Sequence, residues 1–210
     1  MPKFAVIDTE TTGFSNQDRV VEIAIVGLLP DGSIEHAYST LLNPHRDLGA
    51  QHIHKISEAD VLLAPDFRDI AGDLIALLRG CLVVGHNVSF DVRMITNEYA
   101  RAGVPISIAT ADCFCTKQMT AKIIPGEPNT LEACCCRAGV SLEHAHSALG
   151  DALATACLLR VLAARKNGFI GLCEQFNLDA RAARVQWPLV VPKHTRTVQR
   201  GVSGSQQSQR

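Results

Sequence analysis

The chain begins with an apolar segment that ends in two acidic residues, and this segment constrains the fold more than any other. Phe4-Ala5-Val6-Ile7 runs directly into Asp8 and Glu10, and a Thr-Thr-Gly turn follows. Val and Ile favour strands, and side chains two positions apart on a strand point to the same face. Asp8 and Glu10 should therefore stand side by side at the carboxyl end of a buried strand.

Two carboxylates in this arrangement repel each other, and one of them resists ionisation unless a cation lies between them. Carboxylate oxygens next to a turn are ligands that hard divalent metals prefer. The alternative is an exposed strand end with two solvated acids. This segment alone does not decide between a metal site and a solvated strand end.

The pattern of apolar segments predicts an α/β fold. Strands are expected over residues 3 to 9, 20 to 29, 33 to 42, 81 to 85 and 106 to 112. Helices are expected over residues 57 to 63, 66 to 79, 89 to 102, 114 to 121, 130 to 138, 147 to 166 and 169 to 177, with an irregular segment over 43 to 56. Three successive strands predict an antiparallel meander, and the later alternation of strands and helices predicts parallel crossovers. Active sites in such sheets lie outside the carboxyl ends of the strands, where Asp8 and Glu10 are expected.

Two further acids are placed where the same site can use them. Asp91 lies in the first turn of the helix that follows the strand over 81 to 85, and Asp151 lies early on the helix that starts at Ser147. Four carboxylates suit a phosphoryl displacement in which two divalent cations about 4 Å apart hold the attacking and leaving oxygens. All-oxygen ligands favour Mg²⁺ or Mn²⁺. His146 directly precedes the helix that starts at Ser147 and is the candidate general base, because the pKa of histidine lies near working pH.

These residues lie in three segments that resemble the three motifs of the DEDDh 3′-5′ exonucleases. The segments are Asp8-Thr9-Glu10-Thr11-Thr12-Gly13, His86-Asn87-x-x-Phe90-Asp91 and His146-x-Ala148-Leu149-x-Asp151. The resemblance extends over residues 3 to 165, and within the family it is strongest to the DnaQ-like branch of proofreading epsilon subunits of bacterial DNA polymerase III. It implies a ribonuclease H-like fold, with a mixed five-stranded sheet flanked by helices. It also implies two Mg²⁺ or Mn²⁺ ions held by Asp8, Glu10, Asp91 and Asp151, with His146 as the general base.

Candidate substrate contacts surround these ligands. They are Thr9, Thr11, Thr12, Gly13, Phe14, His54, Asn87 and Phe90. Phe14 and Phe90 are candidates because aromatic faces stack on the bases of single strands without sequence preference. The resemblance assigns His54 to a substrate-side His-Gly-Ile segment, in which Lys55 replaces the usual Gly. Ser147 stands where many members carry Arg.

The expected activity is the release of nucleoside monophosphates from DNA 3′ ends, in proofreading or repair. An RNA 3′ exonuclease that trims tRNA ends or short oligoribonucleotides is an alternative, because discrimination depends on how the pocket meets a 2′-OH. A second alternative is an inactive nucleic-acid-binding or polymerase-scaffold subunit. Retention of all five catalytic positions argues against this second alternative.

Charge and composition divide the chain into three expected regions. Residues 1 to 178 form the exonuclease domain, 179 to 192 a C-terminal extension, and 193 to 210 a basic, disordered tail without apolar periodicity. Six basic and no acidic residues follow Asp179, whereas the preceding part holds 14 basic and 21 acidic residues. This distribution suits a polyanionic partner. The end of the chain is a candidate docking segment for a DNA polymerase, a sliding clamp or nucleic acid, and Trp187 is expected to pack back on the domain.

The compartment is expected to be the cytoplasm. No apolar run reaches the length of a membrane span, and the start of the chain does not have the pattern of a signal peptide. The eight cysteines lack the usual zinc spacing and are interpreted as small buried apolar residues. No membrane partner is expected, and the oligomeric state is left open.

Overall fold

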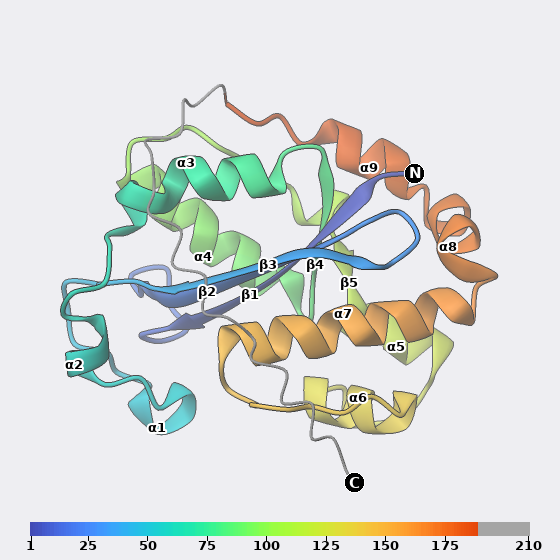
Figure 1. Ribbon diagram of the computed structural model, residues 1–210, viewed down its shortest axis with the longest axis horizontal. Helices are drawn as coiled ribbons and strands as arrows, with labels where there is room; N and C mark the ends of the chain where they lie inside the picture. Colours follow the sequence, from blue (N-terminus) through green and yellow to red (C-terminus); the bar gives the residue numbers. More distant parts are fainter. Residues whose placement is uncertain (189–210) are drawn as a thin grey trace, which may run out of the picture.

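The structure is a computed structural model, and it describes residues 1 to 188 (Figure 1). The predicted disordered tail over 193 to 210, and the last part of the predicted extension from residue 189, lie outside the described residues.

A mixed five-stranded sheet forms the centre of the fold, in the order β3-β2-β1-β4-β5. The strands are β1 (Lys3–Thr11), β2 (Val20–Leu28), β3 (Ile34–Leu41), β4 (Cys81–Gly85) and β5 (Phe114–Cys115). β1, β2 and β3 pair antiparallel, whereas β4 pairs parallel with β1, and β5 parallel with β4. The predicted α/β fold, with a meander at one edge and parallel crossovers at the other, is confirmed.

Helices cover both faces of this sheet (Figure 1). They are α1 (Gln51–His54), α2 (Glu58–Val61), α3 (Phe67–Leu78), α4 (Val88–Arg101), α5 (Thr116–Ile123), α6 (Leu131–Ala138), α7 (Ala148–Ala164), α8 (Gly168–Phe176) and α9 (Leu178–Arg184). Ala5 and Ile7 of β1 belong to the core cluster of α3 and α4, whereas Phe4 and Val6 belong to the cluster of α7. Because side chains alternate along a strand, Asp8 and Glu10 continue the register of Phe4 and Val6 and point to the α7 face.

Capping side chains fix the beginnings of several helices where the sequence predicts them. Ser57 forms a capping box at α2, and Thr130 accepts a hydrogen bond from the N–H of Ala133 at α6. Ser147 accepts from the N–H of Gly150 at α7. The cap at Ser147 matters most for the site, because it sets where the chain of the His146 loop becomes helical.

The strand predicted over residues 106 to 112 is wrong. Residues 110 to 112 form a short 3₁₀ helix, and the paired strand β5 is only Phe114–Cys115. Ile106 and Ile108 instead pack against the core cluster of α3 and α4. Their alternation therefore comes from contact with helices and not from strand pairing.

Three smaller expectations also need correction. The segment expected to be irregular over 43 to 56 contains α1, and the helix expected from 114 begins at Thr116. A further helix, α9, follows α8 and extends past residue 178, with Leu178 and Ala182 buried in the α7 cluster. The predicted domain boundary at 178 therefore falls at the first residue of a packed helix.

Trp187 packs against the cluster of α3 and α4, as predicted. The eight cysteines are free, and Cys81, Cys113, Cys134, Cys135 and Cys173 are buried. Within residues 1 to 188, the helices are too short or too polar to cross a membrane.

Candidate active site

Three of the four predicted acidic ligands meet at the carboxyl end of β1. Asp8 and Glu10 lie on this strand, and Asp151 lies in the first turn of α7. One carboxylate oxygen from each of the three lies within 4.8 Å of the others. The side-by-side placement of Asp8 and Glu10 is thus confirmed, and α7 supplies the third acid from the face to which both point.

Asp91, the fourth predicted acid, reaches the same place from another direction. β4 ends one residue beyond the partner of Val6, so the first turn of α4 lies beside the end of β1. The Asp91 side chain is buried, and its Oδ1 accepts a hydrogen bond of 2.8 Å from the hydroxyl of Thr9. Asp91 is not one of the three acids within 4.8 Å, but its charge is close enough to raise the pKa of Asp8.

Burial raises the pKa of every acid in this group, and repulsion between the carboxylates adds to the effect at Asp8 and Glu10. The pKa of Asp8 lies well above its usual value because of burial and then repulsion from Asp91, Asp151, Glu10 and Glu22. Burial, then Asp151, Glu22 and Asp91, raises the pKa of Glu10 to about 7. Burial also raises the pKa of Asp91 to about 7, against the opposing hydrogen bond from Thr9. A bound cation would relieve this repulsion.

Asp151 shows most directly that the site suits a cation. Its Oδ1 is buried and has no hydrogen-bond partner among the described residues. Burial raises the pKa of Asp151, whereas the charge and the backbone N–H of His146 lower it. A buried carboxylate oxygen without a partner is rare in proteins. An oxygen ligand set of this kind fits Mg²⁺ or Mn²⁺, so the residues present fit the predicted metal site.

His146 lies on the loop that leads into α7, as predicted. Its side chain is exposed, and its backbone has a left-handed conformation with φ 67°. The residue acts on Asp151 through both its ring and its backbone N–H. An exposed imidazole beside the carboxylate group is placed to exchange a proton with a reactant held there.

The predicted threonine contacts have structural partners. Thr9 holds Asp91, and the hydroxyl of Thr11 donates to the carbonyl of Gly13 at 2.7 Å. Thr12 donates to Asp18 Oδ1 at 3.1 Å. The three hydroxyls therefore shape the turn after β1 and hold one acid, while any contact of theirs with substrate stays a prediction.

Phe14 and Phe90 form an aromatic pair, and Phe90 is the residue before Asp91. Their ring centroids lie 6.0 Å apart, and Phe14 is 71% exposed. The guanidinium of Arg93 lies 5.2 Å from the centroid of the Phe90 ring and donates to the Phe14 carbonyl at 3.0 Å. The loop after β1 is thus fastened to α4 in a way that leaves the Phe14 ring open to solvent.

The remaining predicted contacts differ in exposure. His54 is buried at the end of α1, where its Nδ1 accepts from the N–H of Ile56 at 3.1 Å. Asn87 is exposed and precedes α4 in a left-handed conformation with φ 70°. The His86 ring contacts the Thr116 hydroxyl at the start of α5 and the Asn129 carbonyl, so it has structural partners on both sides.

Glu22 is a site residue that the sequence reasoning missed. It lies on β2 directly opposite Glu10 and contributes to the raised pKa values of Asp8 and Glu10. Its Oε2 accepts a hydrogen bond of 2.9 Å from the N–H of Ala148. The register of the predicted hairpin was the available signal, because it brings Glu22 beside Glu10.

The comparisons with known proteins agree with this geometry. A family model described as Exonuclease matches residues 5–159, a range that contains all five predicted catalytic positions. The chain belongs to this exonuclease family.

Relatives of this exonuclease domain include DNA polymerase III epsilon subunits. The subunit from Buchnera aphidicola (subspecies Acyrthosiphon pisum) is 31% identical over 160 residues, which cover 70% of this chain and 66% of that protein. The Escherichia coli subunit is 29% identical over 159 residues, covering 70% of this chain and 65% of that protein. The chain therefore matches about two thirds of the length of these relatives.

A solved structure shares the fold of the exonuclease domain. It is E. coli exonuclease I in complex with a dT13 oligonucleotide, with a TM-score of 0.67 and 17% identity over 80% of this chain and 42% of that one. The ribonuclease H-like fold class is confirmed. Membership of the exonuclease family also implies dependence on a divalent metal and binding to nucleic acid, and the carboxylate cluster agrees with the first.

The two departures from the family pattern have different consequences for the exonuclease backbone. Lys55, which replaces a usual Gly, adopts a left-handed conformation with φ 61°. This is the region that Gly enters most easily, so the loop keeps a glycine-like path despite the substitution. Ser147 serves as the N-cap of α7 and presents no basic group.

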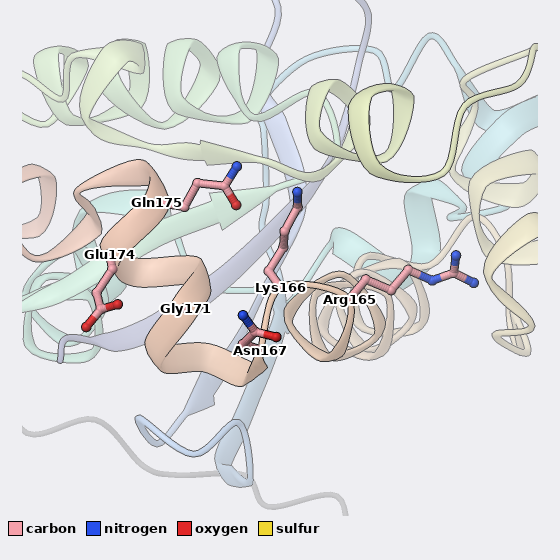
Figure 2. Close-up of a pocket in the computed structure, with 6 residues that line it drawn as sticks. All are labelled: Arg165, Lys166, Asn167, Gly171, Glu174 and Gln175. Carbon is pink, nitrogen blue, oxygen red and sulfur yellow. The ribbon is translucent and has the colours of Figure 1, made fainter.

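A hollow on the exonuclease surface lies far from these carboxylates. Figure 2 shows it between the end of α7 and α8, lined by Arg165, Lys166, Asn167, Gly171, Glu174 and Gln175. α7 has 17 residues and is about 25 Å long at 1.5 Å per residue, with Asp151 near its other end. The hollow is therefore separate from the active site.

Proposed function

We propose that this exonuclease domain hydrolyses DNA from the 3′ end and releases nucleoside 5′-monophosphates, with two Mg²⁺ or Mn²⁺ ions at the carboxylate cluster. The observation that carries the proposal is the convergence of Asp8, Glu10 and Asp151 within 4.8 Å, with Asp91 beside them. The preference for DNA is supported by the epsilon subunits among the relatives.

In this proposal the four acids hold the cations, and His146 handles the proton. The bound cations would place positive charge at the scissile phosphate and neutralise the charge that develops there. His146 accepts a proton from the attacking water, because its exposed ring lies on the loop beside Asp151. Asp91 is kept in place by Thr9, so its orientation is fixed before substrate arrives.

Substrate contacts would surround the reacting phosphate. We expect the turn of Thr11, Thr12 and Gly13 to lie near the terminal nucleotide, and the exposed Phe14 ring to meet a terminal base together with Phe90. Asn87 is exposed at the start of α4 and is a further contact. His54 is buried, so we propose that it maintains the conformation of the substrate-side loop in addition to contacting the substrate.

Competition between labelled ends tests the proposed substrate. The full chain is incubated with Mg²⁺ and equal concentrations of DNA and RNA oligonucleotides of one sequence, each with a distinguishable 5′ label. We expect stepwise shortening of the DNA. A parallel comparison of duplexes with matched and mismatched 3′ ends measures a proofreading preference. Faster shortening of the RNA would replace the DNA proposal by the alternative of an RNA 3′ exonuclease, and shortening of neither would favour an inactive binding subunit.

We further propose that the domain works with a DNA polymerase or a sliding clamp through the end of the chain. The proposal is supported by the relatives named as polymerase subunits and by the basic composition after Asp179. Phe176 and Leu178 pack inside the domain, so α8 and α9 do not offer them to a partner. Truncation after Pro192 should leave exonuclease activity intact and weaken partner binding, and unchanged binding would contradict this role.

A further inference from the structure

Glu22 lies beside the carboxylate cluster without being one of the three acids that approach within 4.8 Å. Its carboxylate accepts the N–H of Ala148, the first residue of α7, at 2.9 Å. The N–H groups of the first helical turn have no partner inside the helix. The contact therefore links the sheet directly to the beginning of the helix that carries Asp151.

The loop before α7 is folded tightly onto the first turn of the helix. His144 and His146 both have left-handed backbones, with φ 57° and 67°. The hydroxyl of Ser147 donates to the His144 carbonyl at 3.0 Å and accepts from the Gly150 N–H at 3.1 Å. A Cβ on Gly150 would lie 2.4 Å from the His144 carbonyl oxygen. Loop and helix start thus form one packed unit that carries both His146 and Asp151.

We propose that Glu22 is a positioning residue of the active site. By accepting the Ala148 N–H, it sets this unit, and with it His146 and Asp151, against Asp8 on β1. The inference rests on the proposed exonuclease function. It assigns to Glu22 an action through other residues and no contact with substrate or metal.

For this hydrogen bond, the length of the side chain at position 22 matters more than its charge. The acceptor must extend from β2 to the backbone of α7, and the amide oxygen of Gln has the same reach as the carboxylate oxygen of Glu. Asp keeps the charge but is shorter by one carbon–carbon bond, about 1.5 Å. Glu22→Gln and Glu22→Asp therefore separate a positioning role from a role as a metal ligand or a counter-charge.

The test compares these two variants in the full chain with Mg²⁺ and a labelled DNA oligonucleotide. We expect Glu22→Gln to keep kcat within about threefold of wild type and Glu22→Asp to lower it about 10- to 100-fold, the size that a misplacement of about 1 Å produces. KM should change less than kcat in both. A role as a metal ligand or counter-charge would not be rescued by the uncharged variant, and a merely structural role would lower Tm in Glu22→Asp without lowering kcat.

A second readout does not depend on activity. Hydrogen exchange of the Ala148 amide, measured by NMR, should stay slow in Glu22→Gln and become faster in Glu22→Asp. Thr130→Ala is the matched control, because it removes the side-chain acceptor at the start of α6, a helix that carries none of the site residues. We expect this control to lower Tm without changing kcat.

Three results would overturn the inference. Glu22→Asp more active than Glu22→Gln, with Mn²⁺ binding lost in Glu22→Gln, would make Glu22 a ligand. Wild-type kcat in both variants would contradict the positioning role. If Glu22→Asp failed to fold, a large loss of kcat in Glu22→Gln alone would also contradict it. A wild-type chain without metal-dependent nucleotide release would instead contradict the proposed function, and the Ala148 exchange would still report on the contact.

Discussion

His144 and His146 are two exposed histidines on one loop, and only His146 acts on Asp151. We expect His146→Ala to lower kcat about 10²- to 10⁴-fold, the usual contribution of a general base. His144→Ala is the matched control. Its kcat should stay within about threefold of wild type, because the His144 ring takes no part in the proposed proton transfer. Steady-state kinetics with saturating Mg²⁺ measures both, and equal losses would contradict the assignment of His146.

Phe14 is open to solvent and pairs with Phe90, the residue before Asp91, so we expect its role to concern substrate more than stability. Stacking of a base on an aromatic side chain contributes about 1–3 kcal/mol. Phe14→Ala should therefore weaken binding of a DNA 3′ end about 5- to 150-fold and leave Tm nearly unchanged. Leu63→Ala, which alters another exposed apolar residue (94% exposed), is the control. Equal binding by wild type and Phe14→Ala, measured by fluorescence anisotropy in Ca²⁺, would remove Phe14 from the substrate contacts.

At the scale of residues, the sequence was most informative where spacing alone decides geometry. Asp8 and Glu10 share a face because strand side chains alternate, and that pairing was predictable. The partner of Thr9 was not, because its bond to Asp91 depends on how the first turn of α4 packs beside β1. Glu22 was missed for a similar reason, since its contact with Ala148 joins residues 126 positions apart.

At the scale of elements, a buried ion pair fastens the loop after β1 to α4. Glu98 is 1% exposed, and Arg19 donates to its two oxygens at 2.6 and 3.0 Å. Glu98 also accepts from Arg101 at 3.2 Å and from the Val20 N–H at 3.3 Å. These contacts hold in place the loop between β1 and β2, which contains Phe14.

Glu98→Ala should lower the free energy of unfolding by about 3–5 kcal/mol, because it leaves the half-buried Arg19 without its partner. Glu35→Ala, which breaks the exposed pair with Lys3, is the matched control and should cost less than about 1 kcal/mol. Urea unfolding measures both. A loss for Glu98→Ala no larger than that of the control would show that the pair does not fasten this loop.

The prediction of elements succeeded where local signals were strong. Ser147 and Thr130 were predicted helix starts, and both side chains make cap hydrogen bonds. The strand predicted over 106 to 112 failed because apolar alternation marks a buried face and does not say whether a strand or a helix covers it. α9 was missed because its burial depends on the tertiary contacts of Leu178 and Ala182.

At the scale of the whole molecule, the crowded acids should make stability depend on pH and metal. The pKa values of Glu10 and Asp91 are about 7, against about 4 in an unfolded chain, so the folded state binds more protons between these values. Its stability therefore falls as pH rises from about 4 through 7 and levels off above about 8. Burial lowers the pKa values of His54 and His86, which opposes this trend only below about pH 6.5.

We therefore expect Tm in EDTA to fall between pH 6.5 and pH 8. Mg²⁺ or Mn²⁺ should raise Tm more at pH 8 than at pH 6.5, because cations bind the ionised carboxylates. Differential scanning fluorimetry at constant ionic strength measures both trends. A Tm that rises with pH in EDTA, or that does not respond to Mg²⁺ and Mn²⁺, would contradict a cation site at this cluster.

Release of the terminal nucleotide from a 3′-labelled single-stranded DNA tests the central claim most directly. With Mg²⁺, the full chain should release labelled nucleoside monophosphate at once, whereas EDTA, Asp8→Ala and Asp151→Asn should each abolish the release while circular dichroism shows a folded protein. Full activity of either variant in Mg²⁺, or equal release in EDTA, would contradict a metal-dependent exonuclease centre at Asp8 and Asp151.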